Sequence, residues 1–144
     1  MSSNRILVLD NEALQAVADR DHPKHTRMLA VLEARTERGD RRPGDVQVLT
    51  TTTVRVEALI DRRVPKTARL NRLRVLDVAL DGARADRAAT LRHQAGGAVA
   101  DATVAEAAIS AAGDGADVTV YTADLSDLPA LMAVRVLRVR IVRI

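Results

Sequence analysis

Short apolar runs alternate along the chain with longer segments in which apolar residues recur at helical spacing. The runs are rich in Val, Leu and Ile, and the first, at residues 6–9, is continuously apolar, which is typical of a parallel strand buried on both faces. The pattern predicts strands at residues 6–9, 46–49, 75–78, 118–121 and 136–144. It predicts helices after Asp10, over residues 23–38, after residues 50–53, around residues 70–73, and over residues 81–94, 101–112 and 128–132.

Strands that alternate with helices are joined by right-handed crossovers and build a mostly parallel sheet covered on both faces. The expected fold class is therefore α/β, a three-layer α/β/α sandwich around a mostly parallel sheet of about five strands. The 144 residues suffice for a single domain, residues 1–144. Because ligands of such sheets bind beyond the carboxyl ends of the strands, candidate chemistry is sought there.

The helix predicted after residues 50–53 carries clear end signals. The Thr run at residues 50–53 supplies side chains that can cap its start, and Pro65 ends it and can open the next helix. The predicted inward face consists of Val56, Leu59 and Ile60. Glu57 is then expected at the edge of the buried face.

Composition narrows the chemistry. The chain has no cysteine, which excludes a disulfide scaffold, a cysteine nucleophile and a thiolate zinc site. Tyr121 is the only aromatic residue, so nucleic-acid binding would rest on charge and not on base stacking. The apolar run at residues 6–9 is cut off by Asp10 and is too short for a signal peptide or a membrane span, so we expect a cytoplasmic protein without membrane association.

Acidic residues stand at or just beyond the predicted strand ends. Asp10 directly follows the first strand, Asp124 and Asp127 follow the fourth, Asp101 opens the alanine-rich helix, and Glu57 lies one turn into the helix after the second strand. Carboxylates gathered at one sheet edge repel one another, and a hard divalent cation such as Mg²⁺ or Mn²⁺ relieves that repulsion. Such ions also activate water for phosphoryl displacement.

Each acid also has an ordinary structural interpretation. Asp10 and Asp101 can be helix N-caps, Glu57 a solvated helix residue, and Asp124 and Asp127 formers of Asx turns. The succession of acids at strand exits along one chain is much harder to assign to such local roles.

Taken together, the motifs resemble those of PIN-domain nucleases, specifically the VapC-type ribonuclease toxins of bacterial toxin–antitoxin pairs. The matching segments, in order along essentially the whole chain, are residues 8–10, 53–59, 100–105 and 120–128. Two positions depart from the family pattern. Leu128 stands where many relatives carry Phe, and Gly96-Gly97 stands where relatives often place a basic residue.

The resemblance implies a function for each acid. Asp10, Glu57, Asp101 and Asp124 would be the catalytic acids that hold Mg²⁺ or Mn²⁺, and Asp127 would be an auxiliary ligand. Thr122 would orient a neighbouring carboxylate. Proteins of this family cut RNA with metal-activated water, leave a 5′-phosphate and a 3′-hydroxyl, commonly form homodimers and are silenced by a cognate antitoxin protein.

Charge is unevenly distributed along the chain. Residues 55–74 hold seven basic and two acidic residues, a net charge of +5, whereas residues 98–127 hold six acidic residues and no Lys or Arg. A basic surface beside an acidic pocket suits a metal nuclease, and a solvated arginine-rich helix face is the alternative. The candidate RNA-binding residues are Arg62, Arg63, Lys66 and Arg69. Arg138, Arg140 and Arg143 are expected to protect an edge strand from pairing.

Two other functions fit a parallel sheet with acidic strand ends. A receiver-like signalling domain would use an aspartate as phosphoacceptor, but it needs paired acids after the first strand and a late Lys, and the last Lys here is Lys66. A non-catalytic domain of the same fold would bind RNA or a protein partner through the basic segment alone. His22 and His25 are three residues apart, but no carboxylate pattern makes them a metal site.

Overall fold

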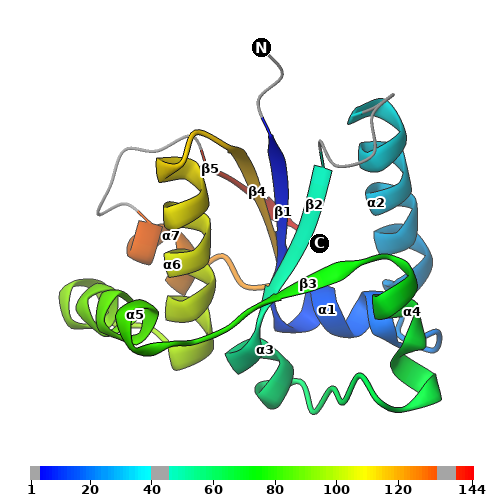
Figure 1. Ribbon diagram of the computed structural model, residues 1–144, viewed down its shortest axis with the longest axis horizontal. Coiled ribbons are helices and arrows are strands. Elements are labelled where there is room, and N and C mark those ends of the chain that lie inside the picture. The colour runs from blue at the N-terminus through cyan, green and yellow to red at the C-terminus, as the bar shows by residue number, and fades with distance from the viewer. Residues whose placement is uncertain (1–3, 40–45, 133–138) are drawn as a thin grey trace.

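The apolar runs form a sheet of five strands, all parallel. The computed structural model describes residues 4–39, 46–132 and 139–144. Its strands are β1 (Arg5–Leu9), β2 (Val46–Thr51), β3 (Val75–Val78), β4 (Asp117–Thr122) and β5 (Val139–Arg143). Their order in the sheet is β3-β2-β1-β4-β5 (Figure 1). The predicted α/β class and parallel sheet are therefore confirmed.

Helices cover both faces of the sheet and complete the three layers (Figure 1). One face is covered by α1 (Asn11–Ala18), α2 (His25–Gly39) and α4 (Ala68–Arg72). The opposite face is covered by α5 (Gly82–Ala95), α6 (Val99–Gly113) and α7 (Asp127–Met132). The short α3 (Thr52–Glu57) lies at the carboxyl end of β2, and the 3₁₀ turn η1 (Pro65–Thr67) leads into α4.

The core lies between β1, β4 and the helices α1 and α6. Val8 and Leu9 of β1 are fully buried, as the continuous apolar run predicts for a central parallel strand. On α6 the inward positions include Ala105 and Ala108, which are also fully buried. Because alanine has a small side chain, α6 packs close to the sheet and brings its first turn to the carboxyl ends of the strands.

Side-chain caps start helices where strands end. Asp10 caps α1 by accepting a hydrogen bond from the Ala13 amide, and Thr51 caps α3 by accepting one from the Val54 amide. Both caps lie directly after strands that are neighbours in the sheet. The carboxyl edge of the sheet therefore carries polar side chains in defined positions.

Two helix boundaries differ from the prediction. Helix α3 ends at Glu57 and does not reach Pro65, because the chain turns at Leu59, whose φ is 56°. The predicted inward face of this helix is wrong, since Val56 is 75% exposed and Leu59 is 91% exposed. Helix α6 begins at Val99, so Asp101 lies within its first turn and is not its N-cap.

The last strand occupies the edge of the sheet beside β4, as predicted. It begins at Val139 in the structure, and residues 136–138 of the predicted strand, Arg138 included, lie outside the described residues. Arg140 and Arg143 are exposed on this edge strand. In the parts of the chain that the structure describes, no helix is long and apolar enough to cross a membrane.

Candidate metal centre

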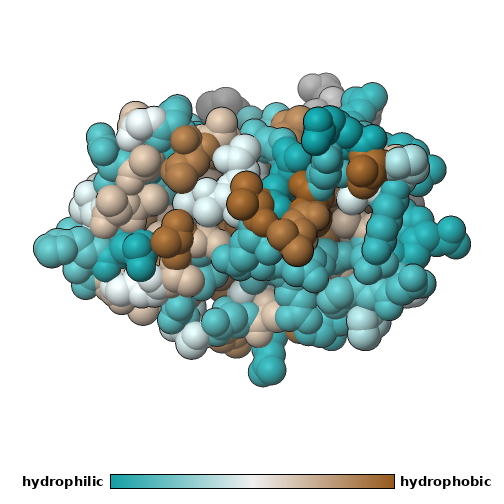
Figure 2. Space-filling model, turned by 90° about the horizontal axis from the view of Figure 1, so that it is seen from below, coloured by the Kyte–Doolittle hydropathy of each residue, from teal (hydrophilic) through white to brown (hydrophobic). Residues whose placement is uncertain are grey.

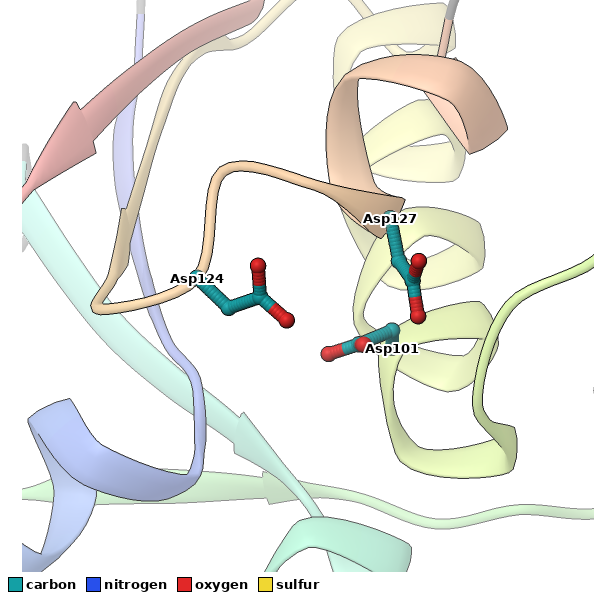
Figure 3. A group of neighbouring side chains, drawn as sticks. All are labelled: Asp101, Asp124 and Asp127. Carbon is teal, nitrogen blue, oxygen red and sulfur yellow. The ribbon is translucent and has the colours of Figure 1, made fainter.

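Three aspartates that are far apart in the sequence converge at the carboxyl edge of the sheet. Asp101 comes from the first turn of α6, Asp124 from the loop after β4, and Asp127 from the start of α7. One carboxylate oxygen from each lies within 4.8 Å of the others. Figure 3 shows the three side chains directed toward a shared space between the loop and the two helices.

A close approach of α7 to the loop before α6 places Asp127 beside Asp101. Asp127 Oδ2 accepts a 3.3 Å hydrogen bond from the amide of Ala98, the residue that precedes α6. Gly97 permits this approach, because its φ is +90° and a Cβ at this position would lie 3.2 Å from Leu131 Cδ1 and 3.5 Å from Asp127 Cβ. Of the two glycines that depart from the family pattern, Gly97 therefore has a packing role here.

Hydrogen bonds of the loop after β4 orient Asp124. Its Oδ1 accepts hydrogen bonds from the Ser126 amide at 2.7 Å and from the Ser126 hydroxyl at 2.5 Å, an Asx turn. These bonds hold the pKa of the Asp124 carboxyl below its usual value. The Thr122 hydroxyl donates to the Asp124 carbonyl at 2.9 Å and accepts from the Asp124 amide at 3.0 Å.

Asp10 lies deeper than the other acids and is 6% exposed. Burial raises the pKa of its carboxyl, and contacts with the Thr122 hydroxyl and with the amides of Ala13 and Ala123 oppose that rise. Thr122 therefore contacts Asp10 with its hydroxyl and braces the Asp124 backbone. The predicted orienting role of Thr122 remains a proposal, and these contacts give it a structural basis.

The charge of the whole acidic group acts on Asp101. Burial, followed by the carboxylates of Asp127, Asp10, Asp124 and Glu57, raises the pKa of Asp101 to about 6. The other four acids singled out from the sequence are thus all close enough to Asp101 to act on its carboxyl. Full ionisation of the group is costly without a compensating cation.

Glu57 stands apart from the three converging aspartates. It is exposed, it is the last residue of α3, and its Oε1 accepts a hydrogen bond from the side-chain amide of Asn11. Asp10 is also absent from the group of three, because its Oδ1 caps α1. The structure therefore brings Asp101, Asp124 and Asp127 together and places Asp10 and Glu57 around them.

The donor set fits a hard divalent cation. Carboxylate oxygens are the ligands that Mg²⁺ and Mn²⁺ prefer. Among the residues that the structure describes, none of the five acids forms an ion pair with Lys or Arg. The mutual repulsion of these carboxylates is thus left for an ion to relieve.

The side chains of the four candidate RNA-binding residues differ in how strongly contacts within the protein hold them. Arg62 is held to β3, where it donates to the Val75 carbonyl and lies 3.6 Å from Asp77. Arg69 is also half-buried and contacts the ring of the buried His25. The other two are exposed: Arg63 pairs with Asp61, and Lys66 lies 3.8 Å from Asp19.

Two residues at the site, Asn11 and Ser126, were not singled out from the sequence, and they hydrogen-bond to Glu57 and Asp124. Gly97 was singled out only as a departure from the family pattern, and the approach of Asp127 to it was not predicted. The Ser126 contact follows from the two-residue spacing of an Asx turn and was foreseeable. The Asn11 contact spans 46 positions, and no local pattern signals it.

Apolar side chains are exposed on the segments around the acids. Val56 and Leu59 belong to α3 and its end, Val99 begins α6, and Leu125 follows Asp124; all four are exposed. Figure 2 views the molecule from the carboxyl edge of the sheet and shows separate hydrophobic patches within a hydrophilic surface. The acidic group therefore opens onto a mixed apolar and polar face.

Comparisons of sequence identify no relative. No protein-family model matches the chain. No curated protein matches it either.

Solved structures match the chain along almost its whole length. VapBC2 from Rickettsia felis, bound to a DNA fragment from its promoter, has a TM-score of 0.61 and 12% identity and covers 96% of this chain and 98% of its own. FitAB bound to the IR36 DNA fragment has a TM-score of 0.56 and 17% identity, covering 95% and 94%. VapC20 of Mycobacterium tuberculosis, a Sarcin-Ricin loop cleaving toxin, has a TM-score of 0.57 and 13% identity, covering 93% and 98%.

At these identities the match establishes the fold, and that fold is the one the motif resemblance implies. The five parallel strands, their order and the flanking helices agree with it along the chain. The chain therefore has the PIN-like α/β fold of the VapC-type and FitAB toxin structures.

Proposed function

We propose that the protein is a metal-dependent endoribonuclease and the toxin of a toxin–antitoxin pair. The observation that carries the proposal is the convergence of Asp101, Asp124 and Asp127 within 4.8 Å at the carboxyl edge of a PIN-like sheet. This edge is where ligands of parallel α/β sheets bind. The motif order and the three similar structures support the same function.

The acids form the catalytic group in this proposal. Asp101, Asp124 and Asp127 hold Mg²⁺ or Mn²⁺, and Asp10 and Glu57 complete the negative environment. A bound divalent cation supplies an activated water and neutralises charge on the phosphate. The Thr122 hydroxyl contacts both Asp10 and the Asp124 backbone and so fixes the position of one relative to the other.

The reaction is hydrolysis of an RNA phosphodiester bond. A water oxygen forms a bond to phosphorus and the bond from phosphorus to the 3′ oxygen breaks. The 3′ oxygen takes up a proton, which leaves a 3′-hydroxyl and a 5′-phosphate. The acids of the chain hold the reacting groups at one edge of the sheet, and the Asp124 turn and the Asp127–Ala98 contact fix their positions.

Lys66 and Arg63 are the strongest candidates for contacts with the RNA backbone. Their side chains are 72% and 90% exposed, and both lie in the basic segment that follows α3. Arg69 and Arg62 belong to the same segment, but their side chains contact His25 and β3, so they contribute more to the folded structure than to RNA binding. A basic segment beside an acidic centre attracts the phosphodiester and holds it near the metal.

The partners follow from the toxin assignment. VapC-type toxins, which the motifs resemble, are silenced by a cognate antitoxin, and we propose such a protein partner for this chain; the similar VapBC2 and FitAB structures are both bound to DNA fragments. RNA is the proposed substrate, a homodimer the proposed assembly and the cytoplasm the proposed location. VapC20 is described as a toxin that cleaves the Sarcin-Ricin loop, which makes structured RNA a useful test substrate.

The proposal is tested by incubating the purified protein with total RNA, with and without added Mg²⁺ or Mn²⁺. Cleavage is expected only with the ion and only in the wild type and in Asp114→Asn. Asp114 is an exposed residue at the opposite end of α6 from Asp101, so Asp114→Asn is a matched control for Asp101→Asn. Asp101→Asn is expected to abolish cleavage.

Each alternative gives a distinct result. Binding of RNA without cleavage would indicate a non-catalytic domain, and stable phosphorylation by acetyl phosphate would indicate a receiver-like domain. Cleavage that persists after chelation of metal would contradict the proposal.

A further inference from the structure

A chain of side-chain amides links α1 to Glu57. The Asn11 amide nitrogen donates to Glu57 Oε1, and Asn11 Oδ1 accepts a 2.5 Å hydrogen bond from Gln15 Nε2. Gln15 lies one helical turn after Asn11 on the same face of α1. Because Asn11 Oδ1 is held by Gln15, the nitrogen of the Asn11 amide is the atom that faces Glu57.

Glu57 lies in a position that does not favour a carboxylate. It is the last residue of α3, where the helix dipole is negative, and its carboxylate and that of Asp101 repel each other. Its side chain is exposed, and within the described part of the chain no Lys or Arg pairs with it. Without another contact the carboxylate would turn into solvent, away from the other acids.

The first turn of α1 controls two of the candidate acids. Asp10 caps this helix through the Ala13 amide, and Asn11 is its first residue. Asn11 therefore relates the position of Glu57 to that of Asp10, although Glu57 ends α3 and Asp10 caps α1. Among the residues that the structure describes, no side chain or amide hydrogen-bonds to Glu57 Oε2.

We propose that Asn11 is a positioning residue of the metal centre, which holds Glu57 Oε1 so that Glu57 Oε2 serves a divalent cation or its bound water. This inference rests on the proposed function. Gln15 supports it by fixing the orientation of the Asn11 amide. Hydrogen-bonded groups behind metal ligands orient those ligands, and their loss typically lowers metal affinity by about 10–100-fold.

The test measures Mn²⁺ binding to the full chain by isothermal titration calorimetry, without RNA. The proteins are the wild type, Asn11→Ala, Glu57→Gln, the double variant of both, and Asn71→Ala. Asn71 is an exposed amide of α4 and provides the matched control. Asn11→Ala is expected to lower Mn²⁺ affinity about tenfold, near the small end of the usual range because the contact is exposed.

The double variant shows whether Asn11 affects Mn²⁺ binding through Glu57 or independently of it. In the Glu57→Gln background, Asn11→Ala is expected to cause almost no further loss, because both changes remove the same arrangement. Thermal unfolding without metal is expected to change little in Asn11→Ala, and Asn71→Ala is expected to bind Mn²⁺ as the wild type does.

The outcomes distinguish this inference from the proposed function. A wild type that does not bind Mn²⁺ would overturn both. A wild type that binds, with Asn11→Ala of equal affinity, would overturn only the role of Asn11. Losses that add in the double variant would show that Asn11 acts independently of Glu57 and would also overturn the inference.

Discussion

The hydroxyl oxygens of Thr51 and Thr103 lie 2.9 Å apart in the buried contact between the start of α3 and α6. Thr103 donates its proton to the Ala100 carbonyl at 2.7 Å, and Thr51 Oγ1 accepts from the Val54 amide at 3.1 Å. The Thr51 proton therefore goes to Thr103. This pair joins the element that carries Glu57 to the element that carries Asp101.

Replacement of Thr103 by Val is expected to destabilise the protein. Val has nearly the same shape, but it leaves the Thr51 hydroxyl, on a residue 2% exposed, without an acceptor. A buried unsatisfied polar group costs about 1–3 kcal/mol, and urea unfolding measures that loss. Thr90→Val is the control, because the Thr90 hydroxyl bonds to the Asp86 carbonyl on the exposed face of α5. Equal stability of the two variants would contradict the role of the hydroxyl pair.

The sheet was predictable from the sequence because the runs that form its central strands are compatible only with strands buried on both faces. The run at residues 6–9 is apolar throughout, and the run at residues 118–121 is apolar or β-branched at every position, so burial on both faces suits both runs. The edge strand at residues 75–78 was also predicted with its observed bounds. By contrast, the end of α3 depends on the turn at Leu59, a residue for which a positive φ has no sequence signal.

The candidate site was predictable in its residues and not in its geometry. Asp10 and Asp124 follow strand ends and Asp101 and Asp127 lie in the first turns of helices, and the parallel topology brings those positions to one edge. The grouping of Asp101, Asp124 and Asp127 depends on how closely α7 packs on the loop at Gly97, which is a tertiary contact. The same limit applies to Arg62, whose contact to β3 no local charge pattern reveals.

Asp101→Asn is expected to change the pH dependence of stability in the absence of metal. The Asp101 pKa is raised from its ordinary 3.8 to about 6, first by burial and then by Asp127 and the other acids. The folded state therefore holds a proton that the unfolded state releases, so stability rises as the pH falls through 6 and the gain is complete below 3.8. Thermal midpoints at about pH 7.5 and about pH 5, with chelator present, measure the gain.

Comparison of Asp101→Asn with Asp114→Asn tests whether Asp101 is the group responsible for the pH dependence of stability. The stabilisation on acidification is expected to be smaller in Asp101→Asn than in the wild type, and Asp114→Asn is expected to behave as the wild type does. Asp101→Asn should also raise the midpoint near neutral pH, since it removes one of the repelling charges. An acidification profile identical in the wild type and Asp101→Asn would show that Asp101 is not the group that titrates.

Divalent cations are expected to stabilise the protein most where the acids are ionised. A cation present at about 100 times its dissociation constant adds about 2.7 kcal/mol to the free energy of unfolding. Thermal unfolding with Mn²⁺ should show a larger shift at about pH 7.5 than at about pH 5, because protons compete for the carboxylates. Potassium chloride of equal ionic strength controls for screening. A shift of the same size in Asp101→Asn would place the binding site elsewhere.

Alanine variants of Arg62 and Lys66 are expected to differ in effect: Arg62→Ala should lower mainly stability, and Lys66→Ala mainly RNA affinity. The Arg62 side chain is 21% exposed and holds β3 through Val75 and Asp77, so Arg62→Ala should lower stability by about 1–3 kcal/mol, as for other hydrogen bonds to charged groups. The Lys66 side chain is 72% exposed, and Lys66→Ala should alter stability by less than about 0.5 kcal/mol.

For RNA affinity the order of the two variants is expected to be reversed: Lys66→Ala, which hardly alters stability, should have the larger effect. Measured in the Asp101→Asn background to prevent cleavage, Lys66→Ala should weaken binding and lower the slope of log affinity against log salt by about one, the signature of a lost phosphate contact. A fluorescence anisotropy titration at several salt concentrations measures both quantities. An unchanged slope would assign Lys66 to the solvated face of the basic segment, because a lysine that meets no phosphate releases no counterion when RNA binds.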